Sequence, residues 1–413
     1  MSTIRPFKAF RPKPEFAGEV AAKPYDVLNS DEARDEVKGH PFSFLHVGKP
    51  EVDLDPGIDL HDARVYEKGK ENLQKLISQK VLVQDPAPFL YVYAQTMGTH
   101  TQYGIVGCAS VEEYWNTTVR KHETTRKDKE EDRCNHVRVT NSHSGPIFLT
   151  YRENAELNTI VDGITSQQPE NNHRALDGIL HRCWVIKDNK VIERIISIFK
   201  TIPNLYIADG HHRSAAAARV GRERAQANPH HRGDEEYNFY LAVYFPANQL
   251  RIMDYNRLIK DVCGMTKEEF FGKLKPNFTI VQAPVQVTPA KKGDFGMFFE
   301  DHWYILSAGP ALQGITDPVL KLDVSILQNS VLDPILGIKD PRIDKRIDFV
   351  GGIRGVGELE RRVNSGEMKI AFSMFPTSVD ELMAIADDDK LMPPKSTWFE
   401  PKLRDGLFVH FLD

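Results

Sequence analysis

The sequence has few cysteines, no long apolar run and no excess of basic residues, and each shortage excludes a class of protein. Its four cysteines contain no Cys-x-x-Cys pair, which argues against a zinc ribbon or a disulfide framework. No stretch approaches the roughly 18 apolar residues of a membrane span, and prolines and charges interrupt the N-terminus where a signal peptide would be apolar. Lys and Arg total 53 against 58 Asp and Glu, so no basic footprint for nucleic acid is present. We therefore expect a soluble, cytoplasmic protein in a reducing compartment, with neither a membrane nor a nucleic acid as partner.

What is present indicates a large globular chain of mixed α and β structure. The 413 residues are 41% hydrophobic, enough for two lobes. Helical spacing predicts a helix over 62–79, and aromatic and β-branched residues predict a strand over 239–246. Residues 348–376 indicate a strand, a helix and a second strand, and Ser378 with Glu381 has the spacing of a capping box. Residues 120–138 are dominated by charge and predict an exposed helix or a mobile loop.

One polar cluster follows an apolar run at residues 205–218, LYIADGHHRSAAAA. Leu205 to Ala208 predict a strand, and the alanine run predicts a helix immediately after it. The polar residues would then lie at a helix N-terminus, whose unpaired N–H groups and partial positive charge favour anions. Gly210 removes the Cβ that would obstruct a ligand. Small alanine side chains would let the helix pack closely on a sheet. Together these features predict a phosphate-binding turn.

The chain contains an internal comparison, because His-His-Arg occurs at 211–213 and again at 230–232. The second copy lies among Pro, Gly and acidic residues with neither strand nor helix beside it, so we assign it to a surface loop. For the first copy, the alternative is that Asp209 and His212 merely cap the helix.

The same cluster carries a family resemblance. ADGHHR at 208–213, KPYDV at 23–27, KHETT at 121–125 and MPPKSTWFEPKL at 392–403 resemble, in this order, the motifs of the DUF1015 family, whose members are often labelled SpoOJ/ParB-like. The central motif is similar to the Gly-His-x-Arg turn of the ParB/sulfiredoxin superfamily, which holds nucleotide phosphates. Free L-serine kinases of that superfamily carry an Asp-Gly-His-x-Arg version, which this sequence matches.

The resemblance also sets limits. Sulfiredoxins have a cysteine at the position of His211, so their sulfinic acid chemistry is not expected here. The DNA-reading helix-turn-helix of ParB proteins has no convincing counterpart in this sequence.

The resemblance implies an α/β (mixed α+β) fold in which a ParB/sulfiredoxin-like phosphate-binding core is joined to an additional mixed-sheet lobe. We expect a catalytic lobe over 1–250 and an α/β lobe over 251–413, with the 392–403 loop returning to the site. The implied activity is transfer of a phosphoryl group from pyrophosphate, ADP or ATP to the hydroxyl of free L-serine, with Mg²⁺ as cofactor. Self-association as a homo-oligomer stays open.

Phosphoryl transfer requires a phosphate cradle, cations and a carboxylate that orients the acceptor. We assign the phosphate to the amides of the turn at Gly210, with His211, His212 and Arg213. Asp209 and Glu123 would be general base and Mg²⁺ ligand, in an order that stays open. An Arg213→Ala variant should then be inactive with its fold intact.

Six further residues are candidates, each with a plainer alternative. Lys121 and His122 would add positive charge near the donor, or belong to a solvated charge run. Lys395, Ser396 and Thr397 would hold a phosphate, or form a rigid turn between prolines. Asp26 would orient the substrate amino group, or only form a turn.

Two other functions remain as alternatives. The first is a ParB-like regulatory or DNA-associated protein that binds nucleotide without catalysis, which the acidic charge balance disfavours. The second is a phosphatase that acts on phosphoserine.

Overall fold

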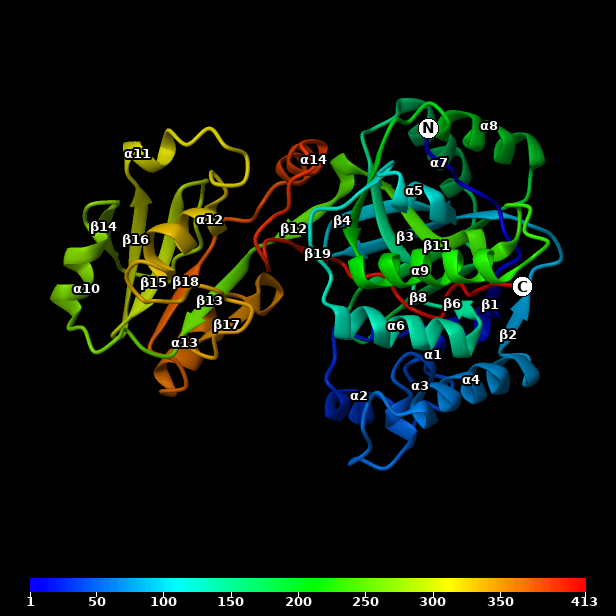
Figure 1. The fold of residues 1–413 in the computed structure, drawn as a ribbon, viewed down its shortest axis with the longest axis horizontal. Coiled ribbons are helices and arrows are strands. Elements are labelled where there is room, and N and C mark those ends of the chain that lie inside the picture. Colours follow the sequence, from blue (N-terminus) through cyan, green and yellow to red (C-terminus); the bar gives the residue numbers. More distant parts are fainter. The chain divides into compact units, whose positions relative to one another are not determined.

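The computed structural model describes all residues from 1 to 413 and has the predicted mixed α/β architecture (Figure 1). The chain divides into two compact units, Met1–Leu250 with Pro401–Asp413, and Arg251–Glu400. Residues 401–413, which the sequence analysis assigned to the second lobe, thus belong to the first unit. The reason is apolar burial near the C-terminus, since Val409 packs in one core cluster with Val20 and Phe44.

An eight-stranded mixed sheet forms the centre of the first unit, in the order β5-β10-β7-β11-β4-β3-β9-β8. Strand β10 pairs in parallel with β5, and β11 pairs in parallel with β7, while the other neighbours are antiparallel. The strands are β3 (Leu90–Met97), β4 (His100–Ser110), β5 (Val119–Arg120), β7 (Ile147–Tyr151), β8 (Asn171–Arg174), β9 (Leu180–Ile186), β10 (Leu205–Asp209) and β11 (Phe239–Pro246). Two short pairs accompany the sheet, β1 (Phe10–Pro12) with β2 (Leu82–Gln84), and β6 (Ser142–His143) with β20 (His410–Phe411).

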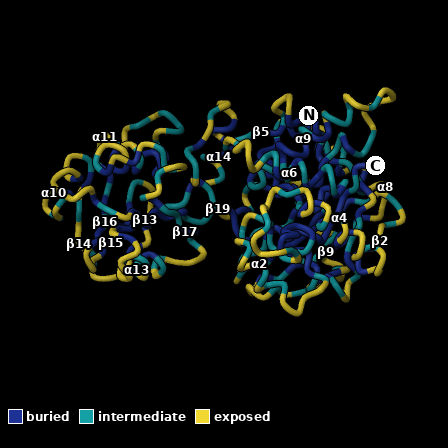
Figure 2. Tube along the Cα trace, turned by 60° about the horizontal axis from the view of Figure 1, so that its bottom comes forward, coloured by how far each residue is buried: buried dark blue, intermediate teal, exposed yellow.

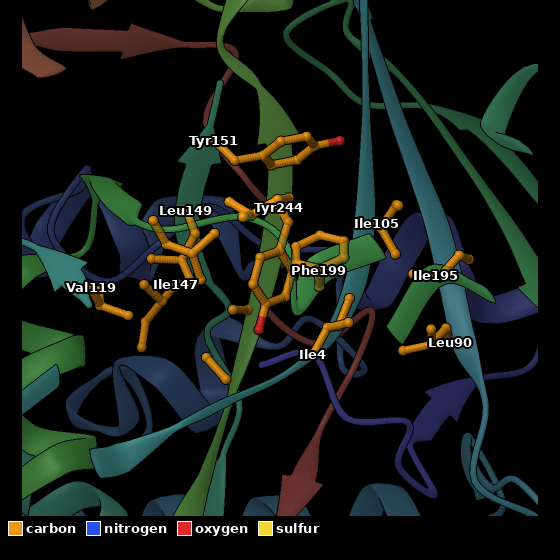
Figure 3. Packing of buried hydrophobic residues seen from close by; sticks show 14 of the residues in the cluster. Ile4, Leu90, Ile105, Val119, Ile147, Leu149, Tyr151, Ile195, Phe199 and Tyr244 are labelled. Carbon is orange, nitrogen blue, oxygen red and sulfur yellow. The ribbon is translucent and has the colours of Figure 1, made fainter. Parts of the chain in front are cut away.

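The centre of this sheet is buried on both faces. Strand β11 is buried from Tyr240 to Pro246, and successive side chains of a strand point to opposite faces. Figure 2 shows the interior of this unit in dark blue, beneath an exposed rim. Figure 3 shows one face of the core, where Tyr244 of β11 and Leu90 of β3 lie in one cluster with Ile195 and Phe199 of α8 (Asn189–Phe199). Burial on both faces explains why these strands are almost continuous apolar runs.

Helix α9 (His211–Ala227) packs on the sheet and along α6 (Lys127–Thr140), as Figure 1 shows. Ala215 and Ala217 belong to the cluster on the sheet side, whereas Ala216 packs with Cys134 and Val137 of α6. The alanine run therefore lets α9 fit closely between the sheet and another helix, and the close packing predicted from it is confirmed. The other helices of this unit are α1 (Ala17–Val20), α2 (Ser30–Glu36), α3 (Leu45–Gly48), α4 (Ala63–Ser78), α5 (Val111–Trp115) and α7 (Ala155–Thr165). None of the helices is both long and apolar enough to span a membrane.

The second unit contains a six-stranded antiparallel sheet in the order β14-β16-β15-β18-β13-β17. Its strands are β13 (Tyr255–Ile259), β14 (Phe278–Ala283), β15 (Asp294–Phe299), β16 (His302–Ala308), β17 (Ile347–Gly351) and β18 (Ile370–Ser373), and β12 (Arg251–Met253) pairs separately with β19 (Trp398–Glu400). Its helices are α10 (Lys267–Leu274), α11 (Pro310–Gln313), α12 (Asp323–Leu327), α13 (Val356–Asn364) and α14 (Val379–Asp387).

Several local predictions can be compared directly with these elements. Helix α4 and strand β11 confirm the elements predicted over 62–79 and 239–246, and the capping box of Ser378 and Glu381 is present at the start of α14. The predicted strand, helix and strand over 348–376 are β17, α13 and β18. However, β13 lies between the two strands and pairs antiparallel with both, so they run parallel without being neighbours.

Candidate functional site

The predicted strand, turn and helix are confirmed at the ADGHHR cluster. Strand β10 ends at Asp209, Gly210 has φ +92°, and α9 begins at His211. Residues with a side chain rarely adopt a positive φ. A Cβ at Gly210 would also lie 3.1 Å from the Arg213 guanidinium. Glycine is therefore required both for the turn and for the close approach of Arg213. The amides of the first turn of α9 have no acceptor within the helix, which gives the turn its capacity for an anion.

Asp209 lies between two cations at the end of β10. Its Oδ2 atom is 3.5 Å from Nη2 of Arg213 and 3.5 Å from Nζ of Lys402. Burial opposes ionisation, but Lys402 and Arg213 outweigh it, so the pKa of Asp209 is lowered. The carboxylate is therefore ionised at neutral pH. Lys402 was missed by sequence reasoning, which selected Lys395 from the same C-terminal motif.

Arg213 is more enclosed than the sequence suggested, since only 9% of its side chain is exposed. Its Nη1 atom donates to the carbonyl of Pro146 at 2.8 Å and lies 3.9 Å from Oδ1 of Asp405. The guanidinium lines a cavity of about 40 Å³ together with Tyr25, Arg133 and Asp405. A cavity of that size holds only a few water molecules, so it is too small for a nucleotide. The Nε and Nη2 atoms are buried without a hydrogen-bond acceptor in the protein, and Nη2 lies 3.5 Å from Oδ2 of Asp209.

Asp405 is a second carboxylate that sequence reasoning missed. Burial raises its pKa to about 7, and the charge of Asp26 adds to this effect, while Arg213 and Arg133 oppose it. The folded protein thus binds a proton at Asp405 that the unfolded chain releases near pH 4. The stability that this proton contributes is fully present below about pH 4 and is lost as the pH rises through about 7.

We therefore expect Asp405→Asn to remove a pH dependence from the free energy of unfolding. Urea unfolding of both proteins from pH 4 to pH 8 measures it. The stability of the unmodified protein should fall relative to that of the variant as the pH rises through this range, because the asparagine of the variant has no proton to release at this position. Parallel pH profiles would contradict a raised pKa at this position.

His122, Glu123 and His211 meet beyond the end of β5, beside the last residues of β10. Nδ1 of His211 lies 3.9 Å from Oε2 of Glu123, and the rings of His122 and His211 are perpendicular with centroids 4.4 Å apart. Burial lowers the pKa of His122 to about 4, although Asp209 opposes the shift. Burial also lowers the pKa of His211 well below its usual value, with His122 and His212 adding to the effect. At neutral pH His122 is therefore uncharged and does not supply the positive charge predicted for it.

The two remaining cationic candidates near the turn contact other parts of the protein. Nζ of Lys121 lies 4.1 Å above the ring of Tyr114, and burial lowers the pKa of Lys121. Nε2 of His212 accepts a hydrogen bond from the backbone N–H of Arg126 at 3.0 Å, at the start of α6. His212 therefore joins α9 to α6, and it caps neither end of its own helix.

Asp26 lies in a turn in which the N–H of Val27 donates to the carbonyl of Pro24 at 3.1 Å. Its charge still acts on the site, because it contributes to the pKa shifts of both Arg213 and Asp405. Asp26 therefore forms the turn that was considered as the alternative, and its charge also acts on Arg213.

Lys395, Ser396 and Thr397 belong to the second unit, and their contacts there are those of a turn. Oγ of Ser396 donates to the carbonyl of Pro393 at 2.6 Å, and the carbonyl of Ser396 accepts from Thr377 at 3.0 Å. Lys395 has φ +60°, and its Nζ lies 5.4 Å above the ring of Tyr255. The rigid turn considered as the alternative is therefore present.

Fold and site together describe a mixed α/β protein with a glycine turn at a strand-to-helix junction, where an ionised carboxylate lies between two cationic side chains. The model of a family described as "Protein of unknown function (DUF1015)" matches residues 4–325, and the chain belongs to this family. No curated protein matches the chain.

Three solved structures show a distant likeness. A conserved hypothetical protein from Pyrococcus furiosus is 13% identical with a TM-score of 0.35, covering 75% of this chain and 95% of its own. A free serine kinase in complex with AMP is 12% identical with a TM-score of 0.37, covering 75% and 92%. SbnI with a C-terminal truncation, from Staphylococcus aureus, is 11% identical with a TM-score of 0.40, covering 74% and 87%.

Proposed function

We propose that this protein is a small-molecule kinase that phosphorylates the hydroxyl of free L-serine, with pyrophosphate, ADP or ATP as the donor. The observation that carries the proposal is the turn at Gly210, where the first amides of α9, the guanidinium of Arg213 and the ammonium of Lys402 lie around one ionised carboxylate, Asp209. This is the Asp-Gly-His-x-Arg pattern of the free serine kinases that the sequence resembles.

The proposed reaction uses these groups in three ways. The amides of α9 bind the donor phosphate, and a shift of the enclosed Arg213 side chain would let its Nε and Nη2 atoms donate to the same phosphate. Asp209 orients the serine hydroxyl and accepts its proton as the oxygen bonds to phosphorus and the bond to the leaving phosphate breaks. Lys402 balances the negative charge that develops on the transferred group.

The residues can be tested for their fit to Mg²⁺. Mg²⁺ prefers oxygen ligands and is often bound by one or two carboxylates together with substrate phosphates, so ionised Asp209 fits this role. Bound there, Mg²⁺ would neutralise charge on the phosphates. Glu123 fits less well, because its carboxylate lies beside two imidazoles.

We expect the purified protein to form O-phosphoserine from L-serine, Mg²⁺ and one of the three donors. The experiment incubates the protein with serine and each donor separately and detects O-phosphoserine by ³¹P NMR and mass spectrometry. Absence of the product with all three donors would contradict the proposal.

The same preparation separates the alternatives. Phosphate release from O-phosphoserine without transfer to a second acceptor would indicate the phosphatase. Salt-dependent DNA binding without turnover would indicate the regulatory protein.

A further inference from the structure

Three metal-ligating side chains meet beside the phosphate-binding turn. The donor atoms of His122, Glu123 and His211 all lie within 4.8 Å of one another. The sheet explains the meeting, because β5 and β10 are parallel neighbours with Arg120 opposite Tyr206. The residues that follow two parallel strands emerge at the same edge of a sheet, so 122 and 123 are brought to the first residue of α9.

We infer that His122, Glu123 and His211 bind one divalent transition-metal ion of the Zn²⁺ type. Two imidazoles and one carboxylate are a ligand set for Zn²⁺ and its first-row neighbours, whereas Mg²⁺ and Ca²⁺ take oxygen ligands. The pattern of three protein ligands leaves one coordination position open, which is typical of metal sites that act on a substrate.

The side chains are placed to accept the ion with little movement. Zn²⁺ binds these ligands at about 2.0–2.2 Å, so two ligand atoms on a tetrahedral ion lie about 3.4 Å apart. The 3.9 Å between Nδ1 of His211 and Oε2 of Glu123 is close to that separation. Both imidazoles are buried and held by packing, while the side chain of Glu123 is 42% exposed and can complete the approach.

The surroundings of His211 also favour a ligand. Nδ1 of His211, which lies 3.9 Å from Oε2 of Glu123, is the ring nitrogen that would bind the ion, and the buried Nε2 atom would then carry the ring proton. Lys121, which directly precedes His122 in the sequence, places its ammonium over the ring of Tyr114. A metal ion would bind one nitrogen of each ring and neutralise Glu123 at the same time.

Because His211 is the first residue of α9, the ion would lie beside the start of this helix, and a phosphate oxygen of the donor is the expected fourth ligand. This last statement rests on the proposed function, whereas the metal site does not.

Metal titration of the full-length protein after treatment with EDTA tests the inference. Co²⁺ is the probe, because its visible absorption reports nitrogen and oxygen ligands directly. We expect saturable binding of one Co²⁺ per chain, displacement by Zn²⁺ and no displacement by excess Mg²⁺. Absence of saturable Co²⁺ binding, or displacement by Mg²⁺, would overturn the inference.

Variants locate the site. Glu123→Gln should fold, because the side chain is partly exposed and glutamine keeps its size. It should weaken Co²⁺ binding at least about tenfold, since loss of even an outer partner of a metal ligand costs 10–100-fold. Glu123→His keeps a ligand and should retain binding. His231→Ala, in the second His-His-Arg copy, is the matched control and should bind Co²⁺ like the unmodified protein. Undiminished binding by Glu123→Gln, or an equal loss in His231→Ala, would place the ion elsewhere.

The titration is repeated with pyrophosphate present. A change in the Co²⁺ absorption supports a phosphate oxygen as the fourth ligand, and an unchanged spectrum rejects it. Because the first titration contains no serine or donor, loss of the metal site and loss of the proposed kinase activity give different results.

Discussion

Replacing Arg213 by alanine is expected to lower the free energy of unfolding by about 3–5 kcal/mol, as well as to abolish phosphoryl transfer. The guanidinium is 9% exposed, and its removal would leave the carboxylates of Asp209 and Asp405 enclosed with less compensating charge. The carbonyl of Pro146 would also lose its donor. Urea unfolding followed by circular dichroism measures this change. The result replaces the expectation, drawn from sequence alone, of an inactive variant with an intact fold.

Two further variants make this prediction specific. Arg232→Ala alters the second His-His-Arg copy, where the side chain is 77% exposed and pairs only with the exposed Asp234, so its unfolding curve should match that of the unmodified protein. Adding Asp405→Asn to Arg213→Ala should recover stability only above about pH 7, because Asp405 binds a proton at lower pH and Arg213 no longer opposes that protonation. An unfolding midpoint for Arg213→Ala equal to that of the unmodified protein would show that the buried ion pairs contribute no stability.

Asp209→Asn is expected to lower kcat for phosphoryl transfer by about 10²–10⁴-fold, because asparagine cannot accept the proton of the serine hydroxyl. Donor binding should be unchanged or tighter, since the substitution removes a negative charge beside Arg213 and Lys402. Initial rates of O-phosphoserine formation at varied donor concentration separate the two effects.

Asp234→Asn is the matched control for this change, because it removes a carboxylate beside the second His-His-Arg copy. Its rate should equal that of the unmodified protein. If Asp209→Asn instead raised KM for the donor and left kcat unchanged, Asp209 would contribute to binding and not to proton transfer.

The sequence was sufficient for the local structure of the site. A short apolar run, one glycine and a run of alanines predicted β10, the turn and α9, because each depends on a few adjacent residues. The sequence also distinguished the two His-His-Arg copies, because only the first follows an apolar run and precedes a run of alanines. The structure places the second copy between α9 and β11, outside any regular element.

The partners of the site residues could not be predicted from sequence. Lys402 and Asp405 lie almost two hundred positions from Asp209 and Arg213, and no periodicity links them. Sequence reasoning selected Lys395 from the C-terminal motif, whose contacts belong to the second unit, because nothing local distinguishes one lysine from the other.

The sequence by itself determined the mixed α/β class, the elements and the glycine-dependent turn, because backbone preferences and apolar periodicity act over short stretches of chain. Only the tertiary structure decided which charges meet and which are buried. The parallel pairing of β5 with β10 brings His122 and Glu123 to His211, and the return of residues 401–413 brings Lys402 to Asp209 and Asp405 to Arg213. Burial and charge pairing set the protonation of these groups, and both arise from contacts between segments far apart in the chain.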